Sequence, residues 1–125
     1  MSYRGYFPKK GSKYHNKKSN GFDSKKEENR YYELKLMERA GIIHDLKRQV
    51  HFELTPTIRQ PDTIGPKGGR KPGKVEEYKS EYIADFTYYQ GEDFIVEDCK
   101  GFRTPEYILK RKIMRHYKGI KIHET

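Results

Sequence analysis

The sequence has one cysteine, no tryptophan, and no apolar run long enough to cross a membrane. The lone cysteine, Cys99, excludes an intramolecular disulfide and a zinc site built from several cysteines. Only 33% of the 125 residues are hydrophobic, which is enough for one modest core and predicts a single folded domain. Because no signal-like apolar segment is present either, we expect a cytoplasmic protein without a membrane partner.

Acidic residues are also scarce, with 18 Asp and Glu against 27 Lys and Arg, so the net charge is +9. The imbalance is strongest in residues 1–22, which contain no acidic residue and place aromatic residues between lysines. We predict that residues 1–22 form a flexible, disordered basic arm and that residues 23–125 form the folded domain. Such charge favours a nucleic-acid partner, although a solvated basic surface and a solubilising tail explain the same composition.

Capping signals predict two helices. Ser24 is a good N-cap before residues 25–40, and Glu27 stands where a capping box needs an acidic residue. Gly41 follows as a stop signal. Thr104 and a proline at the next position open a second helix at about residues 105–117. Its expected core contacts are Ile108, Ile113 and Tyr117, with Leu109 and Met114 beside them.

Alternating apolar and polar residues predict the strands. One strand is expected at residues 47–54, a hairpin at 81–100, and a short final strand within 120–124. Glycine and proline crowd residues 57–77, which we interpret as a long flexible loop. The order helix, three strands, helix, strand predicts an α/β fold with a small mixed sheet flanked by helices.

Charged residues interrupt the predicted hairpin. Asp85 lies in the middle of its first strand, while Asp98 and Lys100 lie at the end of the second. Strand alternation places Asp85 and Asp98 on one face of the hairpin and Tyr82 on the other. Like charges on neighbouring strands destabilise a sheet, and a divalent cation between two carboxylates reverses that effect. A solvent-facing ladder of charges is the alternative interpretation.

Helical geometry adds one more acidic candidate. Glu27 lies within about 40° of Tyr31 and about 20° of Leu34 around the helix axis, on the face expected to be buried. It therefore serves as an inward-pointing ligand, as the carboxylate of the capping box, or as both. Glu28 faces nearer Tyr32 and is the weaker candidate.

The ordered set of an Asp in one strand, an acidic-x-Lys triplet in the next and a helical Glu upstream resembles the PD-(D/E)XK nuclease superfamily. The corresponding residues are Asp85, Asp98, Lys100 and Glu27, and the predicted element order is similar to the restriction-endonuclease-like αβββαβ core. Ala84 stands where the superfamily often has proline. Over residues 13–123 the chain resembles small phage-encoded proteins of this superfamily that are similar to Holliday-junction resolvases, through KYHNKKSNGFDSKKEENRYYELKLMERAGII, YIADFTY and VEDCKG.

The resemblance implies a phage or prophage endonuclease that acts in a bacterial host cell and hydrolyses DNA phosphodiester bonds, with four-way junctions as the expected substrate. Asp85, Asp98 and the backbone carbonyl of Cys99 would bind Mg²⁺ or Mn²⁺. Glu27 would join them directly or through water, and Lys100 would orient the attacking water. Because a symmetric junction suits a two-fold assembly, a homodimer is expected.

Further basic residues are candidates for contact with the DNA backbone. They are Lys67, Arg70, Lys71 and Lys74 in the predicted loop, and Lys110, Arg111 and Arg115 in the second predicted helix. An exposed loop and a solvated helix face are the alternatives. GGRKPGKV lacks the Ser or Thr of a phosphate loop and follows no strand, which argues against nucleotide binding there. The competing functional hypothesis is a non-catalytic, basic nucleic-acid-binding protein that retains the nuclease fold.

Overall fold

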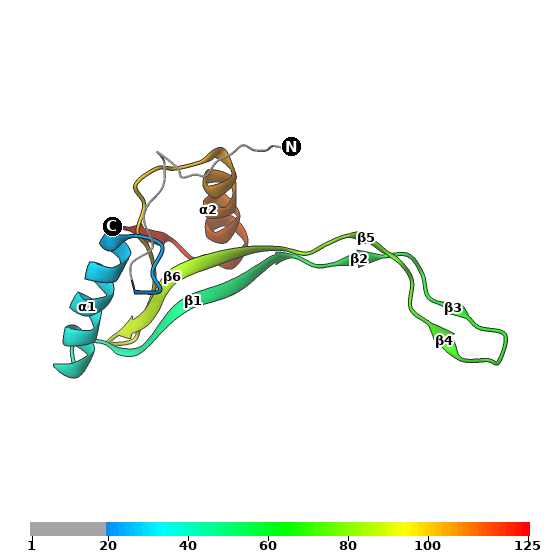
Figure 1. Cartoon of the computed structure of the whole chain (residues 1–125), viewed down its shortest axis with the longest axis horizontal. Helices are drawn as coiled ribbons and strands as arrows, with labels where there is room; N and C mark the ends of the chain where they lie inside the picture. The colour runs from blue at the N-terminus through cyan, green and yellow to red at the C-terminus, as the bar shows by residue number, and fades with distance from the viewer. Residues whose placement is uncertain (1–19) are drawn as a thin grey trace. The chain divides into compact units, whose positions relative to one another are not determined.

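A computed structural model describes residues 20–125, which contain two helices and a four-stranded mixed sheet (Figure 1). The strands lie in the order β1-β6-β7-β8. They are β1 His44–Thr55, β6 Ser80–Gln90, β7 Asp93–Asp98 and β8 Ile122–Glu124. With helices α1 Lys25–Arg39 and α2 Pro105–Lys118, they confirm the expected α/β class and its order of main elements.

The described residues divide into two compact units. The first contains residues 20–46 and the hairpin turn at 88–93, and the second contains residues 47–87 and 94–125. No helix within residues 20–125 is long and apolar enough to span a membrane.

The first unit is organised around α1, whose ends follow the predicted capping. The Ser24 Oγ accepts the backbone N–H of Glu27 over 3.1 Å. Gly41, with φ of +80°, ends the helix in a conformation that glycine adopts most readily. Leu34 is fully buried, and the ring of Phe22 lies 5.2 Å from that of Tyr31. Residues 1–19 of the predicted basic arm lie outside the described residues, and Phe22 at its end is packed against α1.

The second unit holds an apolar cluster between α2 and the sheet. Its buried members are Tyr82, Ala84, Val96, Tyr107, Met114 and Ile122. Thr104 caps α2 through the backbone N–H of Tyr107, as predicted, and Gly119 ends it with φ of +68°. Of the predicted core contacts of α2, Met114 is buried and Ile108 packs against the cluster. Tyr117 was wrongly predicted, because it is 79% exposed, and the buried Tyr107 was not predicted. Tyr107 and Met114 are seven residues apart, so two full turns bring them to one face.

Strand β8 lies parallel to β7, with Val96 opposite Ile122 and Asp98 opposite Glu124. Neighbouring parallel strands need a crossover connection, and α2 supplies it. The predicted terminal strand is therefore confirmed, although it starts two residues later than residue 120. Pairing with β7 therefore places residues 122–124 beside the end of that strand.

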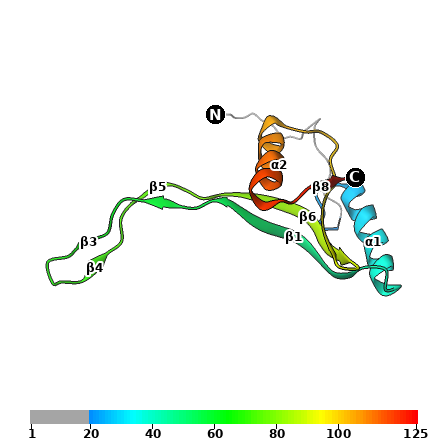
Figure 2. The same ribbon diagram turned by 180° about the vertical axis from the view of Figure 1, so that it is seen from behind.

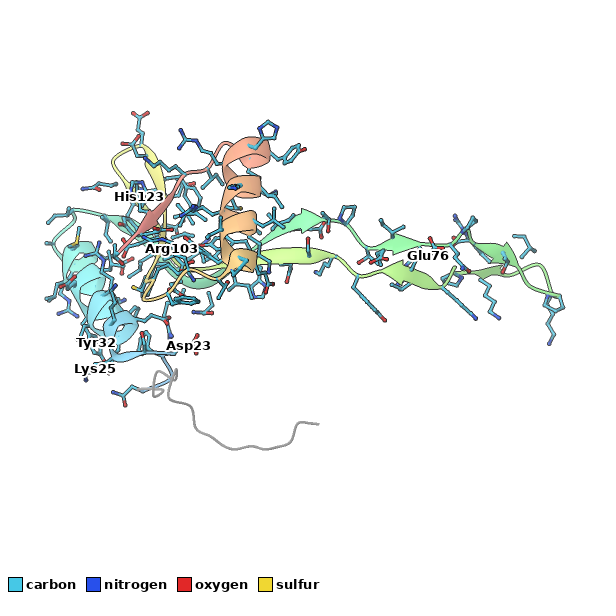
Figure 3. All side chains as sticks on the ribbon, turned by 90° about the horizontal axis from the view of Figure 1, so that it is seen from above. Asp23, Lys25, Tyr32, Glu76, Arg103 and His123 are labelled. Carbon is cyan, nitrogen blue, oxygen red and sulfur yellow. The ribbon has the colours of Figure 1, made fainter. Side chains whose placement is uncertain are left out.

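The prediction of a flexible loop at residues 57–77 was wrong. This stretch forms two short antiparallel ladders, β2 Ile58–Arg59 with β5 Val75–Glu77 and β3 Thr63–Ile64 with β4 Arg70–Lys71. We call residues 56–79 the β-arm; Figure 2 shows the same ladders from behind. None of its side chains is buried, and those such as Glu76 project from the two strands (Figure 3).

Hydrogen bonds to Asp62 hold the β-arm together where its two ladders meet. The carboxylate accepts the backbone N–H of Gly73 over 3.0 Å and the Nε–H of Arg70 over 2.7 Å. A Cβ atom at Gly73 would lie 1.8 Å from the carbonyl oxygen of Gln60, so this position requires glycine. Gly73, one of the glycines that suggested a loop, therefore permits close pairing of two backbones.

Candidate active site

The carboxylate of Asp98 lies at the end of β7 and is almost completely buried, with 2% exposure. Its Oδ2 accepts a hydrogen bond of 2.6 Å from the Tyr82 hydroxyl. Its Oδ1 lies 3.3 Å from the Nζ of Lys100. A buried carboxylate is costly unless it is paired and hydrogen-bonded, and these two partners meet that requirement.

Asp85 reaches the same end of β7 from the neighbouring strand β6. Its Oδ2 accepts the backbone N–H of Cys99 over 2.9 Å, directly after Asp98 in the chain. Burial, the hydrogen bond to Asp98, and the negative charges of Asp98 and Asp85 raise the pKa of the Tyr82 phenol. The structure therefore pairs Asp98 with Lys100 and brings Asp85 to the backbone between them. It also keeps Tyr82 protonated as a hydrogen-bond donor.

The prediction that Asp98 shares a face with Asp85 and not with Tyr82 was wrong, because the side chains of Tyr82 and Asp98 share a hydrogen bond. Strand alternation within β6 directs Asp85 to the other face, from which its carboxylate reaches the backbone N–H of Cys99. Tyr82, Ala84 and Val96 pack in one cluster, so Val96, and with it Asp98 two residues later, lies on the side of Tyr82. Tyr82 was missed as a site residue because its partner depends on how the two strands pack.

Lys100 combines an ion pair with an aromatic contact. Its Nζ lies 4.1 Å from the centroid of the Tyr107 ring, within cation–π range, and its side chain is 23% exposed. It borders an open cleft of about 240 Å³ whose walls include Tyr82, Tyr107 and Lys110. The Lys100 side chain therefore pairs with the buried Asp98 and also lines a cleft.

Glu124 in β8 binds Tyr107, the aromatic residue that Lys100 contacts. Its carboxylate accepts hydrogen bonds from Arg103 (2.6 and 2.8 Å), Tyr107 (2.7 Å) and Arg111 (3.0 Å). The bonds from Arg103, Tyr107 and Arg111 lower the pKa of Glu124 to about 2. Sequence reasoning did not single out Glu124; an acidic residue in a short terminal strand was its only signal. It fixes the Tyr107 ring against which Lys100 packs.

The helical acidic candidates belong to the first unit. Glu27 is 2% exposed, as the helical geometry predicted, and its amide is capped by Ser24. Glu28 is equally buried, and its Oε2 accepts hydrogen bonds from Asn20 (2.5 Å) and Tyr32 (3.2 Å). Asp85, Asp98 and Lys100 belong to the second unit, so the ligand role expected of Glu27 stays a prediction.

The predicted DNA-contacting residues fall into two groups. Lys67, Arg70, Lys71 and Lys74 are exposed on the β-arm, where Arg70 pairs with Asp62. On α2, Lys110 pairs with Glu106 over 3.1 Å and Arg111 pairs with Glu124, while Arg115 is exposed. The charges of Arg70, Lys110 and Arg111 are thus partly compensated within the protein.

A divalent cation beside Asp98 would depend on few side chains. Within residues 20–125, no three His, Cys, Asp or Glu side chains are grouped closely enough to hold a metal ion. The carboxylates of Asp85 and Asp98 are hard oxygen donors, and Mg²⁺ commonly binds one or two carboxylates while keeping several waters. The two carboxylates therefore fit Mg²⁺ or Mn²⁺, and Lys100 supplies a counter-charge to Asp98.

Comparison with known proteins assigns the chain to a family. Residues 9–125 match the model of the family described as "Protein of unknown function (DUF1064)". The match covers most of the 125 residues, so the chain belongs to this family. No curated protein and no solved structure matches the chain.

Proposed function

We propose that the chain is a metal-dependent endonuclease with a restriction-endonuclease-like core, and that it hydrolyses phosphodiester bonds of branched DNA such as four-way junctions. The order α1, β1, β6, β7, α2, β8 agrees with the αβββαβ order of that core. The acidic-x-Lys triplet at the end of β7 and the Asp in β6 agree with its site residues.

One observation carries the proposal: Asp98 is a buried carboxylate whose ion-pair partner, Lys100, also borders an open cleft. Core carboxylates are rare, and a buried pair contributes little net stability compared with apolar residues of the same volume. Asp85 brings a second carboxylate to the backbone beside it. Two carboxylates and a lysine are the groups that hydrolysis of a phosphodiester needs, and of these three Lys100 lines the cleft.

Each residue has a distinct role in the proposed reaction. Asp85 and Asp98 would hold Mg²⁺ or Mn²⁺, which supplies Lewis-acid stabilisation of the scissile phosphate and a nucleophilic hydroxide at neutral pH. Tyr82 keeps Asp98 oriented through its 2.6 Å hydrogen bond. Lys100 would release Asp98 to hold the attacking water and the developing negative charge. The backbone carbonyl of Cys99 is a further proposed ligand, and the ligand role of Glu27 stays a prediction.

The proposed substrate contacts are the exposed lysines of the β-arm, Lys67, Lys71 and Lys74. They carry positive charge along a projecting pair of strands, which suits the phosphates of a duplex. A symmetric four-way junction favours a two-fold dimer that cuts two strands.

The decisive experiment compares cleavage of a labelled four-way junction and of a linear duplex with the same sequence. Each is incubated with Mg²⁺, Mn²⁺ or EDTA and with the wild type, Asp98→Asn or Asp93→Asn. Asn preserves the size of the buried side chain, and Asp93 is an exposed carboxylate at the start of the same strand. We expect metal-dependent cutting of the junction that Asp98→Asn loses and Asp93→Asn keeps.

Cleavage that persists in Asp98→Asn would contradict the assigned site, and cleavage in EDTA would contradict the metal. Equal cutting of both substrates would make the protein a general nuclease rather than one that selects branched DNA.

A non-catalytic nucleic-acid-binding protein is the second candidate. It is favoured by the observation that the buried Asp98 carboxylate accepts a hydrogen bond from Tyr82 and pairs with Lys100 within the protein. This candidate predicts salt-sensitive binding of both DNA substrates and no cutting with either metal.

A further inference from the structure

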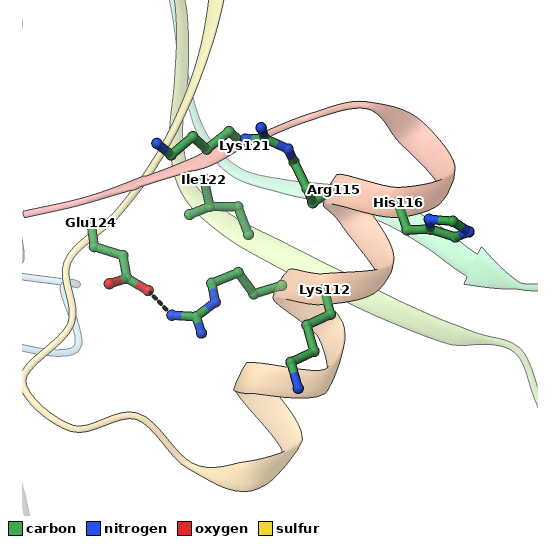
Figure 4. Close-up of a pocket in the computed structure, with 7 residues that line it drawn as sticks. Lys112, Arg115, His116, Lys121, Ile122 and Glu124 are labelled. Carbon is green, nitrogen blue, oxygen red and sulfur yellow. Dashed lines mark hydrogen bonds and ion pairs between the residues drawn. The ribbon is translucent and has the colours of Figure 1, made fainter.

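A second cleft in the 47–87 and 94–125 unit lies between α2 and β8, and its volume is about 620 Å³ (Figure 4). Arg111, Lys112, Arg115 and His116 line it from α2, and Lys121 and Ile122 line it from the β8 segment. The side chain of Ile122 is buried, so it gives the cleft an apolar wall among cationic ones. Its volume lies in the range of pockets that hold nucleotide-sized ligands, roughly 300–1,000 Å³.

Three of these cations lack an acidic partner. Lys112, Arg115 and Lys121 form no ion pair within the part of the chain that the structure describes, residues 20–125. All three are exposed, two on α2 and one just before β8. Like charges gathered around a concave surface raise the local potential and attract an anion.

Glu124, the one acidic residue that lines the cleft, does not oppose an anion there. Its Oε1 accepts both hydrogen bonds from Arg103, and its Oε2 accepts those from Tyr107 and Arg111. Two guanidinium groups therefore compensate a single carboxylate charge. Arg111 is committed to Glu124, and the uncompensated charge of the cleft comes from Lys112, Arg115 and Lys121.

From this arrangement we propose that the α2–β8 cleft is a phosphate-binding site that holds the backbone of a nucleic-acid strand through Lys112, Arg115 and Lys121. The apolar wall at Ile122 gives room for a sugar or base beside the phosphate. Lys112 and Lys121 were not among the residues predicted from the sequence, and Arg111 has a structural role instead. The site goes beyond the proposed nuclease function, because binding here needs neither a metal nor cleavage.

The test measures binding of a fluorescently labelled DNA duplex in EDTA, where no metal-dependent cleavage occurs. The cleft variant is Arg115→Gln with Lys121→Gln. The matched control is Arg39→Gln with Lys118→Gln, which also removes one arginine and one lysine charge, from exposed positions outside the cleft. Circular dichroism and thermal unfolding confirm that both variants are folded.

We expect the cleft variant to bind the duplex about tenfold or more weakly than the control. The slope of log affinity against log salt should also fall by about 2, because each phosphate contact contributes about 0.9 to it. Equal affinities and slopes for the two variants would overturn the proposal.

A competition experiment distinguishes a nucleic-acid strand from free phosphate as the ligand of the cleft. Unlabelled duplex should displace the labelled DNA at far lower phosphate concentration than inorganic phosphate does. Displacement by inorganic phosphate at the same concentration would identify a simple anion site and overturn the assignment to a strand. Because all arms contain EDTA, a failure here is distinguishable from a failure of the Asp98 cleavage test.

Discussion

Tyr82 donates a 2.6 Å hydrogen bond to Asp98, and both side chains are buried. The bond joins β6 to the end of β7 inside the apolar cluster beneath α2. It explains why Asp98 is tolerated in the interior and why its carboxylate has a fixed orientation towards Lys100.

Replacement of Tyr82 by Phe removes this bond and keeps the ring. Asp98 then retains only Lys100 among the partners described above, so we expect the free energy of unfolding to fall by about 1.5–3 kcal/mol, the range for hydrogen bonds to charged groups. Urea unfolding measures the change. Tyr78→Phe is the control, because Tyr78 is 81% exposed on the β-arm and should change stability by less than about 0.5 kcal/mol. Equal effects of the two variants would show that the bond contributes nothing.

Lys100→Met removes the ammonium group beside Asp98 and keeps the length of the side chain. If Lys100 stabilises developing charge, the cleavage rate of the junction should fall by about 10²–10³-fold. Binding of the junction in EDTA should change much less. Lys118→Met removes an exposed lysine at the end of α2 and is the control. A rate that falls only in proportion to binding would assign Lys100 to substrate contact instead.

Glu124 gives the stability of the fold a defined dependence on acid pH. Its pKa is about 2 in the folded protein, below the ordinary value of 4.5, so its contribution is fully present above pH 4.5. It is lost progressively as the pH falls from 4.5 towards 2, because the unfolded state then binds the proton more readily. Glu124→Gln should therefore lower stability at pH 6 and should lose this disadvantage towards pH 2.

Urea unfolding at pH 6, 4 and 3 measures the difference in stability between the wild type and this variant. The exposed strand residue Glu76 supplies the control variant Glu76→Gln. A difference for Glu124→Gln that stays constant with pH would contradict the low pKa of Glu124.

Gly73→Ala tests the β-arm without touching the core. The added Cβ would meet the backbone of Gln60, so the two strands must separate at this point. We expect faster hydrogen exchange of the Gln60 amide, which otherwise donates to the Lys74 carbonyl over 2.8 Å. The global unfolding midpoint should hardly change, because the β-arm contains no buried side chain.

Gly69→Ala is the matched control for the β-arm, since a Cβ there meets nothing within 4 Å. If the Gln60 amide exchanges at the wild-type rate in both variants, the close approach of Gly73 to Gln60 is not a constraint in solution.

Local signals predicted more of this structure than long-range ones did. Ser24 and Gly41 bound α1, and Thr104 with the proline after it opens α2, because capping depends on residues within one turn. The partnership of Tyr82 with Asp98 could not be predicted in the same way, since it depends on how β6 packs beside β7.

Two further differences have equally specific causes. Tyr117 and Met114 both lie in α2, but only the side of the helix that carries Met114 faces the sheet. Met114 is therefore buried and Tyr117 is exposed. A glycine such as Gly73 is typical of a loop and also of two closely paired strands, and the sequence alone does not distinguish them. The β-arm was therefore interpreted as a loop, because the close approach of Gly73 to Gln60 is visible only in the structure.

The β-arm also bears on how the chain folds. Thr55 and Ser80 are 25 residues apart in the chain, yet their hydroxyl oxygens lie 2.7 Å apart at the base of the arm. Closing a structureless loop of that length costs entropy before any contact forms. Here the Gly65 N–H bonds to the Gly69 carbonyl in the turn, and the two ladders connect this turn to the base of the arm. If the arm pairs from its turn, each later pair closes only a short loop, so we expect β1 to pair with β6 faster than across a structureless loop.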